Sequence, residues 1–461
     1  METNEIKQLL FDRYIKPTKS ERKCCMGIEI EMPIVNLNKE AVDFNNVHSV
    51  TKKFIDHFNF DIAGIDDEGN IYSASNKENG DILSYDCSYN NLELSLGKEC
   101  SIFTVWERFQ DYYKYLQSEF KVYNYTLTGM GVNPYRIYNH NVPIPNGRYR
   151  MLFHHLKSYK KYLNIPMYFH EYPEYGTFSS ASQVQLDIAY DELPVILNVF
   201  SKLEPLKALI FSNSVILDEH EDIVCYRDFF WENSTHGINP HNIGMYNSDF
   251  ESVEDILTYI STTSIYCVER GDKYINFEPI RFADYINTDE IIGEYYDNGE
   301  YKNITVKPNP DDIRYLRTFK FEDMTFRGTV EFRSVCCQPI KDSMSVAAFH
   351  IGAKKRFREL NDLFESDTVI YNNGYTATEL RKMFLYTKLP EFVDPDKLYQ
   401  LMEKVLDIIS DGLKERGLGE EEFLKPLYER VKNRTNPAKD MINLRNNGID
   451  LNDIILKYAE I

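Results

Sequence analysis

The sequence has 461 residues, of which 43% are hydrophobic, and a formal net charge of −20 at pH 7. This length and apolar content allow a large core and would permit two or three domains. The acidic balance argues against a basic groove for nucleic acid, and no run of about 18 or more apolar residues predicts a membrane span.

The compartment is predicted from the N-terminus and the cysteines. Residues 1–16 are charged and amphipathic, without the apolar run of a secretory signal. The eight cysteines have neither C-x-x-C nor framework spacing, which favours reduced thiols in a cytosol over disulfides. We therefore expect a cytoplasmic protein with small-molecule partners, no nucleic acid and no membrane partner; its oligomeric state is left open.

The expected elements change character along the chain. Hydrophobic periodicity predicts helices over residues 3–15, 47–59, 101–124, 148–163 and 191–217, the last kinked at Pro205. Strands are predicted over 27–32, within 61–96, and over 126–133, 183–188 and 330–333. Residues 225–244 are loop-rich, and 251–335 mix a helix, short strands and turns. From residue 341 onward the pattern is almost wholly helical. We predict an α+β protein with a body over 1–340 and a helical C-terminal region, 341–461, packed on the same domain.

Four of the predicted strands carry oxygen donors on one face and aliphatic side chains on the other. In 27–32, Glu29 and Glu31 alternate with Ile28, Ile30 and Met32. The corresponding polar residues of the other three strands are Glu93, then Gln183 and Gln185, then Glu331 and Arg333. Joined in one antiparallel sheet, these strands would form a basin lined with carboxylates. An acidic, solvent-facing strand is the alternative interpretation of each pattern taken alone.

The composition of this basin indicates its metal. A site rich in oxygen, poor in histidine and free of thiols suits Mg²⁺ or Mn²⁺ rather than zinc or copper. No Walker motif, H-E-x-x-H or G-x-S-x-G is present. Gly129-x-Gly131 lacks the third glycine of a dinucleotide-binding fingerprint, and His154-His155 is expected to be a helix-surface pair.

Seven short motifs resemble, in the same order, those of the plant and actinobacterial branch of the glutamate–cysteine ligase superfamily. They are 27–31 (G-x-E-x-E), 92–94 (the second acidic strand), 129–134 (G-x-G-x-x-P), 145–151 (P-K-G-R-Y-x-x-M), 182–187 (V-Q-V-N-L-D), Arg227 with Trp231 (S-R-x-x-x-W) and 330–333 (L-E-x-R). The resemblance covers nearly the whole chain.

The resemblance implies a fold related to glutamine synthetase, with a curved, mainly antiparallel sheet covered by helices. It implies metal ligands at Glu29, Glu31, Glu93, Gln183 and Glu331, and catalytic roles for Arg227, Arg333 and Glu331. It further implies that Gln183, Gln185 and Arg333 bind the nucleotide, and that Arg148, Tyr149, Arg227 and Trp231 bind substrate. The implied cofactors are ATP and Mg²⁺, with Mn²⁺ possible.

The implied reaction suits these residues. Phosphorylating the γ-carboxylate of glutamate creates a leaving group, and an amine then displaces phosphate; cysteine as the amine would give γ-glutamylcysteine, the first step of glutathione-type thiol synthesis. Mg²⁺ and arginine neutralise the phosphates. The chain departs from the family after Trp231, where a Thr-Asp-x-x-Arg stretch is replaced by a run containing His236 and His241. Gln185 stands where relatives have Asn, and Asn146 where they have Lys.

Three alternatives follow. The first is the same chemistry with another amino acid or amine in a specialised pathway, because the departures affect the amino-acid site more than the ATP site. The second is a non-catalytic paralogue that binds nucleotide. The third is a metal-dependent hydrolase, for which the sequence offers no histidine-rich set that would activate water.

Overall fold

A nine-stranded antiparallel sheet forms the centre of the computed structural model, which describes residues 3–22 and 25–461. The strand order is β14-β15-β7-β1-β5-β4-β3-β2, and β6 pairs with β1. The strands are β1 (Met26–Asn36), β2 (Asp61–Ile65), β3 (Ile71–Ser75), β4 (Ile82–Tyr85), β5 (Asn91–Glu99), β6 (Tyr125–Leu127), β7 (Ser182–Asp187), β14 (Glu322–Met324) and β15 (Thr329–Phe332). The four strands predicted to carry oxygen donors are therefore adjacent, as β15, β7, β1 and β5.

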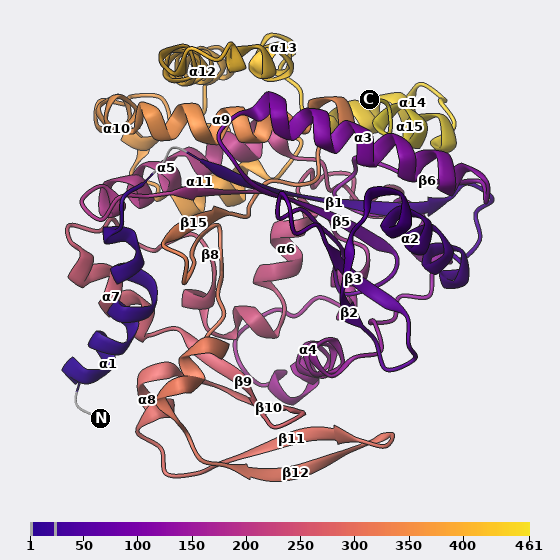
Figure 1. The fold of residues 1–461 in the computed structure, drawn as a ribbon. Helices are drawn as coiled ribbons and strands as arrows, with labels where there is room; N and C mark the ends of the chain where they lie inside the picture. The colour runs from indigo at the N-terminus through magenta and orange to yellow at the C-terminus, as the bar shows by residue number, and fades with distance from the viewer. Residues whose placement is uncertain (1–2, 23–24) are drawn as a thin grey trace.

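Helices cover the apolar face of this sheet. Ile28, Ile30 and Met32 of β1 are buried on that face, beneath α3 (Ile102–Lys121), α5 (Leu193–Phe211) and α9 (Met344–Lys355) (Figure 1). Both α5 and α9 are buried almost all round, because each lies between the sheet and further helices.

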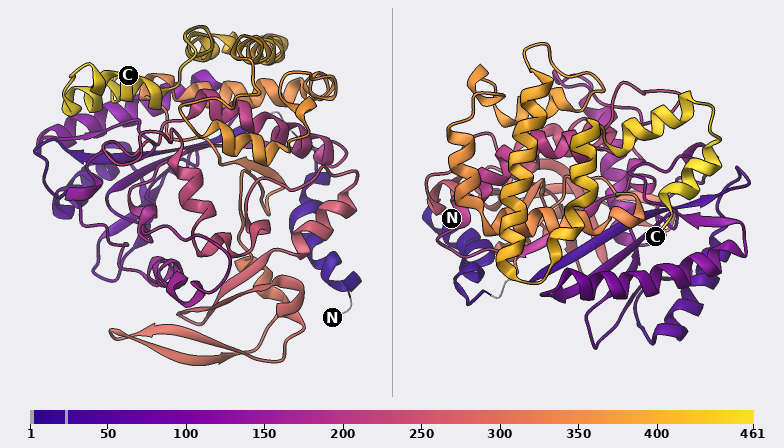
Figure 2. Two further views of the ribbon diagram at one scale, coloured as in Figure 1. Left: turned by 180° about the vertical axis from the view of Figure 1, so that it is seen from behind. Right: turned by 90° about the horizontal axis from the view of Figure 1, so that it is seen from above.

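The C-terminal region forms the outer part of this helical layer. It contains α10 (Phe357–Glu365), α11 (Ala377–Phe384), α12 (Pro395–Arg416), α13 (Lys425–Asn433), α14 (Pro437–Asn446) and α15 (Leu451–Tyr458). Figure 2 shows α12 and α13 lying over the inner helices when the molecule is seen from above. The almost wholly helical pattern predicted from residue 341 onward is confirmed by these helices, whereas the division of the chain at residue 340 stays a prediction.

Smaller elements surround the opposite, polar side of the sheet. They are α1 (Thr3–Leu10), α4 (Gly147–Lys157), α6 (Tyr226–Glu232), α7 (Val253–Ser261), α8 (Phe282–Ile286), the β8 (Ile243–Gly244) and β13 (Phe319–Lys320) pair, and a four-stranded sheet of β9 (Ser264–Arg270), β10 (Lys273–Arg281), β11 (Ile291–Asp297) and β12 (Glu300–Val306). The β11–β12 hairpin projects furthest from the main sheet (Figure 1). None of the helices in the described ranges combines the length and apolar character that a membrane crossing requires.

Several predicted boundaries are corrected. The strand expected over 126–133 is only Tyr125–Leu127, because the chain then leaves the sheet to contact residues around Gln338. The helix expected over 191–217 ends at Phe211 and runs on through Pro205. The helix α2 (Phe44–Phe58) begins three residues before the predicted start, because Asp43 caps it.

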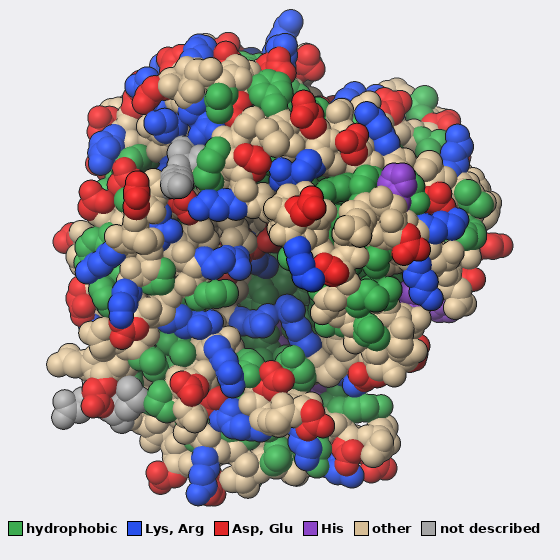
Figure 3. Space-filling model, in the orientation of Figure 1, with side chains coloured by type: hydrophobic (Ala, Val, Ile, Leu, Met, Phe, Trp, Pro, Cys, Tyr) green, Lys and Arg blue, Asp and Glu red, His purple; other side chains and the backbone are tan. Residues whose placement is uncertain are grey.

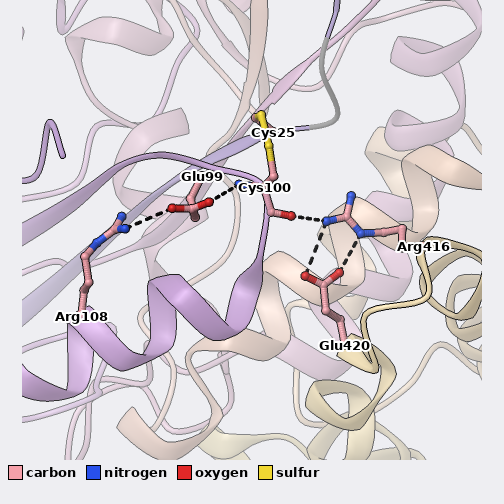
Figure 4. The surroundings of a disulfide bond; sticks show 6 residues. All are labelled: Cys25, Glu99, Cys100, Arg108, Arg416 and Glu420. Atoms are coloured by element: carbon pink, nitrogen blue, oxygen red, sulfur yellow. Dashed lines mark hydrogen bonds and ion pairs between the residues drawn. A yellow bond between two sulfur atoms is a disulfide. The ribbon is translucent and has the colours of Figure 1, made fainter.

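The expectation of reduced thiols is wrong for Cys25 and Cys100, which form a disulfide (Figure 4). Cys25 precedes Met26 of β1 and Cys100 follows Glu99 of β5, and Met26 and Glu99 are paired in the register of the two strands. The pairing brings together residues 75 positions apart, a proximity that the spacing of cysteines in the sequence cannot reveal. Cys24, its neighbour in the sequence, lies outside the described residues.

Candidate active site

The oxygen donors of the four neighbouring strands lie on one face of the main sheet. Glu31 of β1 stands opposite Glu93 of β5, and Glu331 of β15 stands opposite Gln185 of β7. Side chains of directly paired residues point to the same face. Six predicted site residues therefore share this face, which we call the acidic face: Glu29, Glu31, Glu93, Gln183, Gln185 and Glu331.

Hydrogen bonds orient the carboxylates of this face. Glu31 accepts one from the amide N–H of Ala181 at 2.6 Å and one from Gln183 Nε2 at 2.8 Å. Glu93 accepts one from Ser95 Oγ at 2.6 Å. The side-chain oxygen of Gln183 is buried without a hydrogen-bond partner among the described residues, and such an oxygen is available to a cation.

Three carboxyl groups of the acidic face, those of Glu29, Glu31 and Glu93, have raised pKa values. Burial, and after it the nearby Asp86 carboxylate, raise the pKa of Glu31 to about 8 and that of Glu93 to about 7. Burial also raises the pKa of Glu29 well above its ordinary value, and Glu331 and Glu93 add to the effect. A divalent cation would compete with these protons, because it neutralises the same repulsion.

The acidic face opens onto a cavity of about 410 Å³. Figure 3 shows the hollow, with blue basic side chains around it and green hydrophobic ones within it. Predicted site residues that line the cavity are Glu31, Arg148, Tyr149, Gln183, Arg227, Trp231, Glu331 and Arg333. Glu29, Glu93 and Gln185 share the acidic face but are not among the lining residues.

Cationic side chains outnumber acidic ones around the cavity, eight to four. The cationic residues are Arg13, Arg148, Arg227, Arg314, Arg317, Lys320, Arg327 and Arg333, and the acidic ones are Glu31, Asp86, Asp323 and Glu331. Of the seven arginines among them, only Arg333 makes an ion pair within residues 3–22 and 25–461, with Glu331. Unpaired guanidinium groups around one cavity favour an anionic ligand.

The two predicted catalytic arginines are held next to each other. Arg333 Nη1 lies 2.6 Å from Glu331 Oε1. Arg227 donates from Nη1 to the carbonyl of Ser334 at 3.3 Å and from Nη2 to that of Arg333 at 3.4 Å. The backbone of one arginine thus positions the side chain of the other, and Arg227, Arg333 and Glu331 lie close together.

Several charged cavity residues were missed in the sequence, among them Asp86 and Lys320. Asp86 follows β4 and lies seven positions before Glu93; burial raises its pKa despite the opposing Arg148. The sequence signal that could have identified Asp86 was its position at the end of a strand next to the strand that carries Glu93. Lys320 is buried and donates to the carbonyls of Ile243 at 2.8 Å and Met245 at 2.7 Å, while burial lowers its pKa to about 7. No sequence pattern marked Lys320.

The histidines differ from expectation. His155 is buried and stacks on Tyr266 with ring centroids 4.0 Å apart, so the prediction of a surface pair is wrong for it; α4 packs against β10 and turns this residue inward. His154 is partly exposed and pairs with Glu294 at 2.9 Å. His236 lines the cavity, and burial lowers its pKa to about 3. His241 lies outside the cavity lining and contacts Thr262.

No group of three or more His, Cys, Asp or Glu side chains in the described ranges has the geometry of a ready metal site. The acidic face nevertheless offers buried carboxylates with raised pKa values and the free oxygen of Gln183. This donor set fits Mg²⁺, which commonly takes one or two carboxylates and fills its other positions with phosphate oxygens and water.

Comparisons with known proteins agree with this fold. No protein-family model matches the chain. It is 24% identical over 319 residues to a chloroplastic glutamate–cysteine ligase of Nicotiana tabacum, covering 66% of this chain and 55% of that protein. It is 22% identical over 315 residues to the chloroplastic glutamate–cysteine ligase of Solanum lycopersicum, and this match covers 66% of this chain and 54% of that protein. The chain spans about half the length of the curated relatives it matches.

A solved structure shares the fold over most of both chains. A crystal structure of glutamate–cysteine ligase from Francisella tularensis in complex with AMP superposes with a TM-score of 0.51 and 11% sequence identity. The match covers 96% of this chain and 89% of that one. The predicted fold class, a mainly antiparallel sheet covered by helices, is confirmed.

Proposed function

We propose that this chain, which belongs to the glutamate–cysteine ligase superfamily, is an ATP- and Mg²⁺-dependent ligase that couples the γ-carboxylate of glutamate to an amine. L-Cysteine is the leading candidate amine, with γ-glutamylcysteine as product. One observation carries the proposal: the acidic face opens onto a cavity lined by eight cationic side chains, in a chain of net charge −20. Such a cavity favours a polyanionic substrate accompanied by divalent cations.

The acidic face would hold the metal. The residues we assign to it are Glu29, Glu31, Glu93, Gln183 and Glu331, joined by Asp86. When bound, Mg²⁺ neutralises phosphate charge and stabilises the charge that develops as the γ-phosphoryl group moves. Mn²⁺ prefers the same oxygen donors.

The cationic residues would hold the anionic groups of the substrates. The planar guanidinium suits phosphate and α-carboxylate oxygens, so we assign catalytic roles to Arg227, Arg333 and Glu331. We assign Gln183, Gln185 and Arg333 to the nucleotide, and Arg148, Tyr149, Arg227 and Trp231 to the amino-acid substrates.

The reaction then needs positioning more than a nucleophilic side chain. A γ-carboxylate oxygen of glutamate attacks the γ-phosphorus of ATP, which forms an acyl phosphate and releases ADP. The amine nitrogen attacks the acyl carbon, phosphate leaves, and the nitrogen gives up a proton as the amide forms. Arg227, fixed by the carbonyl contacts described above, and Arg333, held by its ion pair with Glu331, offset the negative charge in both steps.

A second candidate keeps this chemistry with another amine. Two observations bear on the choice. His236, which burial keeps neutral, occupies the cavity after Trp231, where relatives carry a charged stretch. Arg148 lines the cavity and has no ion pair in the described part of the chain, so it is available to a substrate carboxylate. Arg150 is not available, because it pairs with Asp67 and lies over the ring of Tyr296.

The test is ADP release from Mg-ATP and L-glutamate with a panel of amines that includes L-cysteine. We expect release that requires glutamate and an amine, and a rise in melting temperature with Mg-ATP. A kcat/KM for cysteine far above that of every other amine would reject the second candidate. ADP release with no amine present, or Mg-ATP binding without turnover for any acid and amine, would reject the ligase in favour of a hydrolase or a non-catalytic paralogue.

A further inference from the structure

We infer that Arg381, on α11 of the C-terminal helical region, is a positioning residue for Arg227 and Arg333. This inference rests on the proposed function, because it gives those two arginines a role in catalysis. Arg381 is outside the cavity lining and is 3% exposed, so it acts through other residues.

Arg381 joins two acidic side chains from separate helices. Its Nε and Nη2 donate to Asp228 Oδ2 at 2.7 Å and Oδ1 at 3.1 Å. Its Nη1 donates to Glu204 Oε2 at 2.6 Å and to the Glu204 carbonyl at 2.8 Å. All but one of the N–H groups of the guanidinium therefore donate hydrogen bonds in fixed directions. A lysine ammonium could not reproduce this arrangement.

Both acidic partners lead directly to the two arginines of the site. Asp228 is the neighbour of Arg227 on α6. Glu204 Oε1 accepts a hydrogen bond at 3.0 Å from Ser334 Oγ, and Ser334 is the neighbour of Arg333. Arg227 in turn donates to the carbonyls of Arg333 and Ser334.

These contacts form a closed ring through four segments of the chain. The ring runs from Arg381 to Asp228, along the backbone to Arg227, across to Ser334, and back through Glu204. Lys207 completes the charge balance by pairing with Glu204 at 2.5 Å, so two cations face two anions in a buried site. A buried ion network is weak evidence for stability, and we infer that this one fixes the geometry of the two arginines.

Arg430 provides a matched control within the same molecule. It is 5% exposed, belongs to α13 of the same C-terminal region, and likewise reaches a carbonyl of α5, at Ile210, and a carboxylate, at Asp342. None of its hydrogen-bond partners adjoins Arg227 or Arg333 in sequence. A general loss of packing between helices and body would therefore affect both arginines alike.

The test compares Arg381→Lys, Ser334→Ala and the control Arg430→Lys in the full chain. We measure kcat and KM for glutamate and ATP, the melting temperature, and the rise in melting temperature with Mg-ATP. We expect kcat/KM to fall at least 10-fold in Arg381→Lys and about 3-fold or more in Ser334→Ala, which removes a single hydroxyl. Arg430→Lys should stay within twofold of wild type.

The outcomes separate the two proposals. The inference is overturned if Arg381→Lys keeps wild-type kinetics, or if Arg430→Lys loses as much activity; should Arg381→Lys fail to fold, unchanged kinetics in Ser334→Ala overturn it. If the wild-type protein binds Mg-ATP but turns over no acid and amine, only the ligase proposal fails. The rise in melting temperature with Mg-ATP then tests the inference, because Arg381→Lys must reduce this rise while Arg430→Lys must retain it. A wild-type protein that neither turns over nor binds Mg-ATP refutes both.

Discussion

The side chains of the acidic face are subject to two opposing requirements, one from burial in the folded protein and one from binding a metal. Burial and mutual repulsion disfavour the charged forms of Glu29, Glu31 and Glu93, as their raised pKa values indicate. A metal-bound nucleotide would require the same carboxylates to be charged. Single substitutions on this face should therefore separate stability from activity.

Glu331→Gln should abolish most of the ATP turnover while leaving the fold stable. The substitution removes a proposed metal ligand, and we expect kcat/KM to fall about 100-fold or more, or about 3 kcal/mol of transition-state stabilisation. The melting temperature should change by only a few degrees, because the lost ion pair with Arg333 is offset by weaker repulsion from Glu29. ADP release and thermal unfolding measure the two effects.

Glu300→Gln, at an exposed position on β12, is the control and should behave as wild type in both measurements. Near-wild-type turnover of Glu331→Gln at saturating Mg²⁺ would contradict the assignment of Glu331 to the metal.

The pH dependence of stability should report the raised pKa of Glu31. The folded protein holds this proton up to about pH 8, whereas the unfolded chain releases it near the ordinary value of 4.5. Its contribution to the free energy of unfolding is thus fully present below about pH 4.5 and is lost as the pH rises through about 8. Urea unfolding without nucleotide, at pH 5.5 and 8.5, should show a smaller decline in Glu31→Gln than in wild type. Equal declines would show that Glu31 has no raised pKa in the folded protein.

At the scale of elements, β1 organises the site. It pairs with β5 on one edge and with β7 on the other, and β6 continues the second pairing beyond residue 34. The chain leaves β6 at the Gly129-x-Gly131 motif, which lacks a phosphate-binding fingerprint. Its glycines have a packing role instead, because backbone approaches them closely.

Gly129→Ala should destabilise the protein by about 1–3 kcal/mol, the usual effect of forcing an atom into a packed site. A Cβ at Gly129 would lie 2.1 Å from the Gln338 carbonyl oxygen, and backbone cannot easily withdraw. Gly27→Ala in β1 is the matched control, because its Cβ would meet nothing nearer than 3.8 Å. Denaturant midpoints measure both, and a Gly129→Ala protein as stable as Gly27→Ala would refute the close approach.

At the scale of the molecule, links between distant segments hold the helical layer to the sheet. Arg381 and Arg430 connect C-terminal helices to α5, and the Cys25–Cys100 disulfide joins the start of β1 to the end of β5. Arg416 of α12 hydrogen-bonds to the carbonyl of Cys100 and so connects the disulfide to the helical layer (Figure 4).

Reduction of the disulfide should lower the free energy of unfolding by about 2–5 kcal/mol, because the link between residues 75 positions apart restricts the unfolded chain. Denaturant unfolding with and without reductant measures the effect. The double variant C25S/C100S should match the reduced wild type and show no further response to reductant. Alkylation of both cysteines in the native protein without reductant would contradict the disulfide.

The sequence by itself determined the local features. Period-two alternation assigned Glu29, Glu31, Glu93 and Glu331 to strands with one polar face, and helical periodicity located the C-terminal helices. Both patterns can be recognised in the sequence because each depends on residues only two to four positions apart. The order of the short motifs was enough to indicate a resemblance to the glutamate–cysteine ligase superfamily.

Only the tertiary structure decided which segments meet. It placed Asp86 and Lys320 in the cavity, turned His155 inward, paired Cys25 with Cys100, and tied Arg381 to the neighbours of Arg227 and Arg333. Each of these contacts joins residues far apart in the chain or depends on which face of a helix is covered. The free energy of these contacts depends on burial and on the register between elements. Neither can be predicted from a local sequence pattern.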